Sequence, residues 1–210
     1  VWTAVPVRPV RTAGKATWTL RLPSAGTTAY RVRVPGTAAL AAGASATQTL
    51  TATLKGKGNP KAFSFVGGTR ANPARWNPCQ VIAYKVNTRY AKPGALADVQ
   101  ETMRRITQYS GLRFRYTGAT SYLPGISRGA TPAPMVIAWA NSRVDRSFRD
   151  PYLAGYATPA WYLTARPRII RAGVMLNAGM AMPAGFGTGF TRGMLLMHEI
   201  GHAVGLGHVN

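Results

Sequence analysis

The sequence predicts an α+β fold built in two parts that meet near residue 60. Residues 1–60 contain β-branched runs separated by small residues and turns, a pattern typical of an all-β segment. From residue 61 onward, apolar runs of strand length are joined by a segment with a clear helical period. Residues 55–60, where Lys and Gly alternate before a Pro, indicate a linker. We therefore expect two domains, at residues 1–60 and 61–210.

Four strands are expected in the first part, at residues 5–11, 16–22, 28–34 and 46–54. In the third of these, Val32 and Val34 alternate with Arg31 and Arg33, which predicts one buried face and one exposed face. The stretch resembles part of an immunoglobulin-like sandwich, a fold that needs about seven strands and about 100 residues. We expect a partial domain of this kind, with its N-terminal portion outside the sequence.

One amphipathic helix and several strands are expected in the second part. The helix covers residues 95–109, with Leu96, Val99, Met103 and Ile106 at helical spacing, and Gly111 ends it. Strands are predicted at residues 81–86, 112–116, 135–140 and 168–177. The last strand is expected to bend or bulge at Gly173. Residues 141–167 show no clear period and are predicted to form a long loop.

The charge of the chain is strongly positive, with 26 Lys and Arg against 5 Asp and Glu and a pI near 11.5. A hydrophobic content of 46% excludes a disordered basic tail, because it is enough to build a core. The cations are scattered and no DNA or RNA motif is present, which argues against sequence-specific nucleic-acid binding. The uncharged runs at 34–54 and 172–191 are too polar and Gly-rich for a transmembrane helix.

The strongest functional signal lies at the C-terminal end, where residues 198–208 read His-Glu-Ile-Gly-His-Ala-Val-Gly-Leu-Gly-His. This segment matches His-Glu-x-x-His-x-x-Gly-x-x-His at every fixed position, and its three histidines are the only ones in the chain. On a helix capped by Thr191, His198 and His202 lie one turn apart and can meet a single cation.

Neighbouring residues of the motif support the same interpretation. An opposite apolar stripe is expected to bury this second helix and consists of Leu196, Ile200, Ala203 and Val204. Gly205 and Gly207 permit positive φ angles, which would end the helix and bring His208 back as a third ligand.

Three neutral imidazoles leave one position of tetrahedral zinc open for water, which is the catalytic arrangement. Bound zinc lowers the pKa of that water and polarises a carbonyl oxygen beside it. Glu199 is placed to act as the general base for the water and then to pass the proton to the departing amine. The motif therefore predicts zinc-dependent hydrolysis of amide bonds.

With these residues the chain resembles the metzincin metallopeptidases, most closely the secreted bacterial matrixin-like enzymes. The resemblance rests first on residues 198–208 and also on the segment 76–84, Trp-Asn-Pro-Cys-Gln-Val-Ile-Ala-Tyr. It implies a secreted zinc endopeptidase that acts on proteins or peptides, although exopeptidase action stays open. It also implies a catalytic subdomain with a twisted mixed sheet, a backing helix, a zinc-ligand helix and an edge strand that aligns the substrate. The candidates for this edge, or for its neighbour, are Gly173, Val174, Met175, Leu176 and Asn177.

One departure from the family concerns methionine. Metzincins have a Met-containing turn beneath the metal, downstream of the third histidine, and the sequence stops at Asn210. Met194 and Met197 lie within the ligand helix and cannot take that place. We expect the C-terminal subdomain to be absent from this chain, which leaves open whether the chain is active by itself.

Cys79 is the only cysteine, so it cannot form an internal disulfide. A disulfide to a cysteine outside the sequence, a buried free thiol and a cap on the zinc are the three roles considered.

Calcium is a second metal that the sequence leaves open. Asp145 and Asp150 are expected to cap turns rather than to bind Ca²⁺, because five carboxylates provide few oxygen ligands. Asn141, Asn177 and backbone carbonyls are further oxygen donors for such a site.

The strongly positive charge of the chain suggests a second function. The alternative is a secreted basic module that adheres to anionic polymers or cell-wall surfaces and carries a vestigial or incomplete metal site. Metal dependence separates the two functions, because a chelator should abolish hydrolysis whereas polyanion binding should follow ionic strength.

Overall fold

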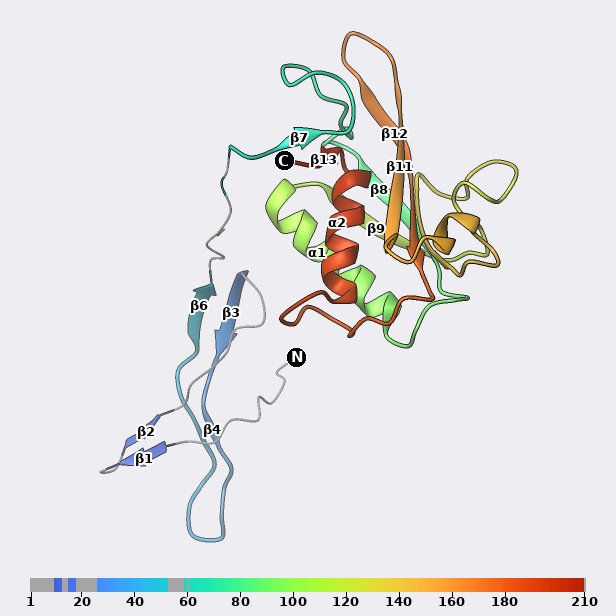
Figure 1. Ribbon diagram of the computed structural model, residues 1–210. Helices are drawn as coiled ribbons and strands as arrows, with labels where there is room; N and C mark the ends of the chain where they lie inside the picture. The colour runs from blue at the N-terminus through green and yellow to red at the C-terminus, as the bar shows by residue number, and fades with distance from the viewer. Residues whose placement is uncertain (1–9, 13–14, 18–25, 53–58, 60, 210) are drawn as a thin grey trace. The chain divides into compact units, whose positions relative to one another are not determined.

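The computed structural model describes residues 10–12, 15–17, 26–52, 59 and 61–209, and the chain divides into two compact units, Val1–Asn59 and Pro60–Asn210. In the described part, two α-helices and several β-sheets give a mixed α+β protein (Figure 1). None of the helices found there is both long and apolar enough to cross a lipid bilayer.

Short antiparallel pairs make up the described residues of the first unit. Strand β1 pairs with β2, β3 with β6 and β4 with β5. The strands are β1 (Val10–Thr12), β2 (Lys15–Thr17), β3 (Gly26–Tyr30), β4 (Arg33–Val34), β5 (Gly43–Ala44) and β6 (Gln48–Ala52). The described strands of this unit form two-stranded sheets, and no sandwich is present among them.

The first unit differs from the sequence prediction in its burial. The expected strand 28–34 is divided between β3 and β4, and the expected strand 46–54 contains β6. The predicted buried face is wrong, because Val32 and Val34 are 39% and 59% exposed. A two-stranded hairpin has no second layer to cover its apolar side chains. The predicted strands 5–11 and 16–22 and the predicted linker 55–60 lie mostly outside the described residues.

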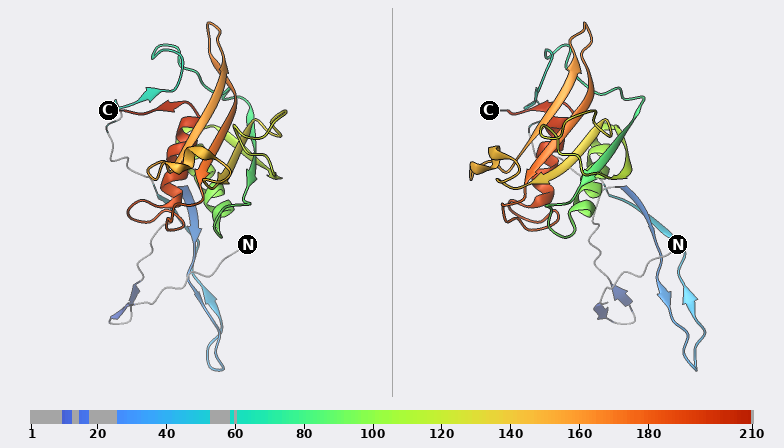
Figure 2. Two further views of the ribbon diagram at one scale, coloured as in Figure 1. Left: turned by 45° about the vertical axis from the view of Figure 1, so that its right-hand side comes forward. Right: turned by 90° about the vertical axis from the view of Figure 1, so that its right-hand side faces the viewer.

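A five-stranded mixed sheet forms the centre of the second unit. Its order is β11-β12-β10-β8-β9, in which β11 is an antiparallel edge and the other neighbours are parallel. The strands are β8 (Val81–Asn87), β9 (Arg113–Ala119), β10 (Met135–Ala140), β11 (Gly155–Tyr162) and β12 (Arg168–Asn177). Two views at other angles show the β11–β12 hairpin reaching beyond the other strands (Figure 2).

Two helices, α1 (Ala95–Ser110) and α2 (Arg192–Ala203), pack on one face of this sheet (Figure 1). Val99 and Met103 of α1 are buried in one cluster with Val86 and Val174 of the sheet. A smaller cluster around Phe148 covers part of the other face. Strand β10 therefore has all six of its residues buried, as expected for a central parallel strand.

Predicted elements of the second unit agree with the structure at most positions. The strands 135–140 and 168–177 are confirmed as β10 and β12, and the helix 95–109 as α1. The irregularity of β12 does not lie at Gly173 but further toward its start, opposite Ala160 and Trp161. Gly173 has a different role, because a Cβ there would collide with Pro124.

The stretch 141–167 is not the long loop that the sequence predicted. It contains the short 3-10 helix η1 (Arg146–Arg149) and the eight-residue edge strand β11. Pro159 lies within β11, and an edge is the one place where a strand tolerates proline, since its outer side needs no backbone donor.

Candidate metal centre

Helix α2 carries two of the three histidines, and its first turn is firmly fixed. The Thr191 hydroxyl accepts a hydrogen bond from the Met194 backbone N–H at 3.3 Å, which is N-cap geometry. Arg192 forms a buried ion pair with Asp98 of α1, with Nε and Oδ2 2.6 Å apart. The ion pair joins the first turn of α2 to α1, on the N-terminal side of His198.

Three of the four residues in the predicted apolar stripe are buried, and the fourth, Val204, is partly buried at the C-cap of α2. Leu196, Ile200 and Ala203 have no solvent-exposed surface, and they pack in the main core. His198 and His202 lie one turn apart on the more exposed side. The buried stripe therefore fixes the direction in which both imidazoles point.

The chain turns back immediately after α2. Gly205 has a φ of 114°, and its backbone N–H donates to the His202 carbonyl at 2.9 Å. A Cβ on Gly205 would lie 2.8 Å from the Ala74 carbonyl oxygen, so only glycine fits this turn. Gly207 does not have the positive φ that the sequence suggested; a side chain there would instead collide with Ser64.

A short strand pair brings the third histidine to the helix. Strand β13 (Leu206–Gly207) pairs antiparallel with β7 (Ser64–Phe65), and the Ser64 hydroxyl donates to the His208 carbonyl. Sequence reasoning missed β7, because a two-residue strand has no detectable period. His208 is therefore positioned by residues from the opposite end of the unit.

The three imidazoles converge through their Nε2 atoms. The separations are 3.1 Å between His198 and His202, 3.0 Å between His202 and His208, and 3.1 Å between His198 and His208. Tetrahedral zinc with Zn–N bonds of about 2.05 Å holds its ligand nitrogens about 3.3 Å apart, so the triangle fits a single cation. Among the described residues, this is the one group of three or more His, Cys, Asp or Glu side chains close enough to hold a metal ion.

The contacts of two imidazoles prepare them to bind a metal. His202 Nδ1 lies 2.7 Å from the Leu206 carbonyl oxygen, which can only accept, so Nδ1 carries the proton and Nε2 presents a lone pair. Partial burial lowers the pKa of His198, and the neighbouring His202 and His208 lower it further. The first contact leaves Nε2 as the ring nitrogen of His202 that faces the triangle, and the lowered pKa favours the neutral, metal-binding form of His198.

Glu199 is buried beside this triangle, close enough for His202 to affect its pKa. It is 4% exposed, and a Cβ on Gly155 of β11 would be 3.1 Å from its Cγ and Oε1 atoms. Burial raises the pKa of Glu199 to about 7, and the nearby His202 opposes that shift. No hydrogen bond to its carboxylate is found among the described residues, and no fully buried side-chain oxygen there lacks a partner, so the carboxylate oxygens keep some contact with solvent. A carboxylate with this pKa can accept a proton and release it again near neutral pH.

The candidate substrate-binding residues Gly173, Val174, Met175, Leu176 and Asn177 lie in β12. They pair with β10 on one side and β11 on the other, so their backbone cannot receive another strand. The free edge is their neighbour β11, which begins at Gly155 beside Glu199. The residues that sequence analysis selected therefore support the edge rather than form it.

Cys79 is exposed, which contradicts the buried-thiol alternative. It lies in the turn before β8, where its backbone N–H donates to the Asn77 side chain at 3.1 Å. The group of metal-ligating side chains found among the described residues does not include Cys79.

The four residues considered for calcium all cap turns. Asp145 Oδ1 accepts from the Ser147 N–H, and its Oδ2 accepts from the Tyr156 hydroxyl at 2.6 Å. Backbone N–H groups that follow in the chain likewise donate to the side-chain oxygens of Asp150, Asn141 and Asn177. Turn capping is thus the contact that these oxygens make.

Comparisons with known proteins add no relative to this description. A scan against protein-family models and a search of curated proteins both found no match for the chain.

Proposed function

We propose that this chain carries the catalytic centre of a zinc-dependent endopeptidase of the metzincin type, acting on proteins or peptides outside the cell. The observation that carries the proposal is the convergence of three imidazole nitrogens, 3.0–3.1 Å apart, beside a buried glutamate. Structural zinc sites are closed by four protein ligands, whereas three histidines are typical of catalytic sites.

The chemistry of the donor set favours zinc. Neutral imidazole suits Zn²⁺, while Mg²⁺ and Ca²⁺ prefer the oxygen ligands that this triangle lacks. Held by His198, His202 and His208, zinc would supply a Lewis acid that polarises a peptide carbonyl and makes water a better nucleophile. The Leu206 carbonyl keeps the His202 ring in the orientation and tautomer that such a ligand needs.

Glu199 has the proton-transfer role in this proposal. Its carboxylate accepts a proton from the attacking water and then delivers it to the nitrogen of the departing amine. Because burial raises its pKa to about 7, Glu199 can both take up and release a proton near neutral pH.

Strand β11 is suited to orient an extended substrate. An edge strand offers unpaired N–H and C=O groups on its outer side, so a peptide can add to it without a demand for one sequence. Its first residue, Gly155, lies against Glu199, which would bring a peptide bond on this edge near the proton acceptor. The mixed sheet, backing helix α1 and ligand helix α2 also support the metzincin resemblance.

The deciding experiment measures zinc stoichiometry by elemental analysis together with chelator-sensitive casein hydrolysis. We expect one zinc per chain, and its loss in His202→Ala. The control is Met194→Ala on the same helix, since Met194 is 51% exposed and is not a member of the histidine group. Full zinc content in His202→Ala, or none in the parent chain, would overturn the proposal.

Adhesion to anionic polymers is the second candidate function, and the charge distribution favours it. Five acidic residues cannot neutralise 26 Lys and Arg, and Arg113 and Arg115 alternate on the exposed side of edge strand β9. Binding to an anionic resin that ionic strength weakens and a chelator leaves unchanged, together with zinc-loaded protein that hydrolyses no peptide, would establish this function instead.

A further inference from the structure

The central sheet has a notch where strand β10 begins. Met135, the first residue of β10, pairs with Tyr84 of β8 and Ala172 of β12. Both outer strands start earlier in register, at Val81 and Arg168, so β10 does not extend between their first residues. Pro134 precedes β10 and has no N–H to continue the ladder.

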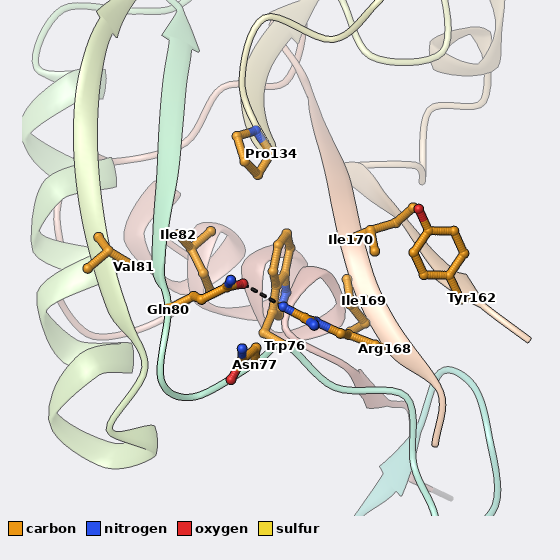
Figure 3. Close-up of a pocket in the computed structure, with 10 residues that line it drawn as sticks. All are labelled: Trp76, Asn77, Gln80, Val81, Ile82, Pro134, Tyr162, Arg168, Ile169 and Ile170. Carbon is orange, nitrogen blue, oxygen red and sulfur yellow. Dashed lines mark hydrogen bonds between the residues drawn. The ribbon is translucent and has the colours of Figure 1, made fainter. Parts of the chain in front are cut away.

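A cavity of about 370 Å³ fills this notch. Figure 3 shows Trp76 between β8 and β12, with Ile82 on one side and Ile169 on the other. The lining also includes Val81, Pro134, Tyr162 and Ile170. The volume and the apolar walls are those of a small-molecule site, which is commonly 300–1,000 Å³ with a few polar groups.

The polar groups of the notch lie on the side where Gln80 and Arg168 meet. Arg168 Nη2 donates to Gln80 Oε1 at 2.6 Å, a contact drawn in Figure 3. All five acidic side chains belong to the described residues, and none of them forms an ion pair with Arg168. A guanidinium has five N–H donors, so Gln80 occupies a minority of them. Arg168 therefore offers a positive charge beside an apolar cavity.

From these features we propose that the notch binds a small organic carboxylate with an apolar body. The apolar body packs on the Trp76 indole and the isoleucine side chains, which removes apolar surface from water. The carboxylate meets Arg168, where a planar fork of donors matches two oxygens. Asn77 adds a side-chain amide to the same lining.

Two side chains of the notch, Trp76 and Ile169, contact the segment that carries the candidate metal centre. The Trp76 indole N–H donates to the Ala203 carbonyl at 2.9 Å, and Ala203 is the last residue of α2. Ile169 Cδ1 lies 3.4 Å from the position of a Cβ on Gly205. A ligand in the notch thus contacts the two side chains that support the turn between His202 and His208.

Isothermal titration calorimetry with three probe acids, benzoate, 3-phenylpropionate and octanoate, tests this proposal. Each acid is compared with its matched alcohol, on the full chain in metal-free buffer, so that a metal at the histidines does not contribute. We expect saturable binding of at least one acid and about tenfold weaker binding of its alcohol. No saturable binding by any of the three acids would overturn the proposal, whatever the peptidase test shows.

Two variants and a control locate the binding. Arg168→Gln should weaken the acid about tenfold and remove the preference over the alcohol. Ile170→Asp should abolish acid binding, because it places a negative charge in the wall of the notch. Arg171→Gln is the control, since Arg171 is exposed on the same strand but does not line the cavity. Equal loss in Arg168→Gln and Arg171→Gln would mean unspecific charge attraction and would also overturn the proposal.

Discussion

Each helix of the second unit buries one carboxylate, and the two carboxylates have opposite surroundings. Asp98 of α1 accepts hydrogen bonds from Arg192 and from the Gly185 backbone N–H, at 2.6 and 3.1 Å. Glu199 of α2 is buried to a similar degree, but no such donor is found for it among the described residues. Asp98 therefore stabilises the fold, whereas the carboxylate of Glu199 stays without such a donor, at a cost in stability.

Burial alone therefore does not identify a reactive acid. A buried carboxylate with full hydrogen bonding is a structural group, and one without it is a candidate for chemistry. Two substitutions test this distinction and two more test other contacts of the same helices, and the four are ordered below by the size of the effect expected.

Glu199→Gln should give the largest effect, and the effect should fall on turnover. We expect casein hydrolysis by the zinc-loaded chain to decrease about 10²- to 10⁴-fold, because the general base is lost. Thermal stability should stay the same or increase, since a neutral amide avoids the cost of a buried charge. Turnover within tenfold of the parent rate, with zinc retained, would remove Glu199 from the mechanism.

Asp98→Ala should act on stability. Removal of one partner of a buried ion pair leaves Arg192 uncompensated and should lower the free energy of unfolding by about 3–5 kcal/mol. Urea denaturation measures it, with Asp150→Ala as the control because Asp150 is exposed and caps a turn. Equal stability losses in the two variants would show that Asp98 is not the structural carboxylate inferred here.

Gly205→Ala tests the turn that follows α2. A positive φ and a contact with the Ala74 carbonyl should together cost about 1–3 kcal/mol and weaken zinc binding through His208. Gly201→Ala is the matched control in α2, because a Cβ at Gly201 meets nothing within 4 Å. That control should be neutral or up to about 1 kcal/mol more stable. A stable, fully zinc-loaded Gly205→Ala variant would refute the steric argument.

Glu101→Gln should give the smallest effect. Glu101 is partly exposed on α1, and hydrogen bonds from Arg104 and Arg105 lower its pKa to about 2. The ionised Glu101 contributes at most about 1 kcal/mol to the free energy of unfolding. This contribution is present above the pKa that Glu101 has in the unfolded chain, and it is lost as the pH falls toward the lowered pKa of the folded state. Urea denaturation of both proteins at pH 7, 4 and 2.5 should show a difference that shrinks with acidity. A difference that grows on acidification would reverse the assigned sign.

Much of the second unit could be predicted from the sequence, because its elements have strong local signals. The apolar run of β10 and the helical period of α1 are each set by a full layer of neighbours, so periodicity reports them. The geometry of the three histidines could also be predicted from the motif. One helical turn separates His198 from His202, and Gly205 allows the chain to turn back toward them.

The remainder depended on contacts between distant residues. Strand β11 was missed because Gly155 and Pro159 weaken its local pattern, and its pairing with β12 comes from the hairpin. The β7–β13 pair leaves no periodic trace, although Gly207 is the one hint of close backbone approach. In the first unit, alternation of Val32 and Val34 with arginines suggested a buried face, but alternation cannot report whether a covering layer is present.

The link between Ser64 and His208 has a consequence for how the metal centre is made. These residues are 144 positions apart, and everything between them must be synthesised before they meet. During vectorial synthesis on a ribosome, His208 emerges after His198 and His202, so a nascent chain that has not reached it cannot assemble the triangle. Closing so long a segment is slow and entropically unfavourable. A cation that binds only the closed arrangement would stabilise it by mass action, and its uptake would report that Ser64 and His208 have met.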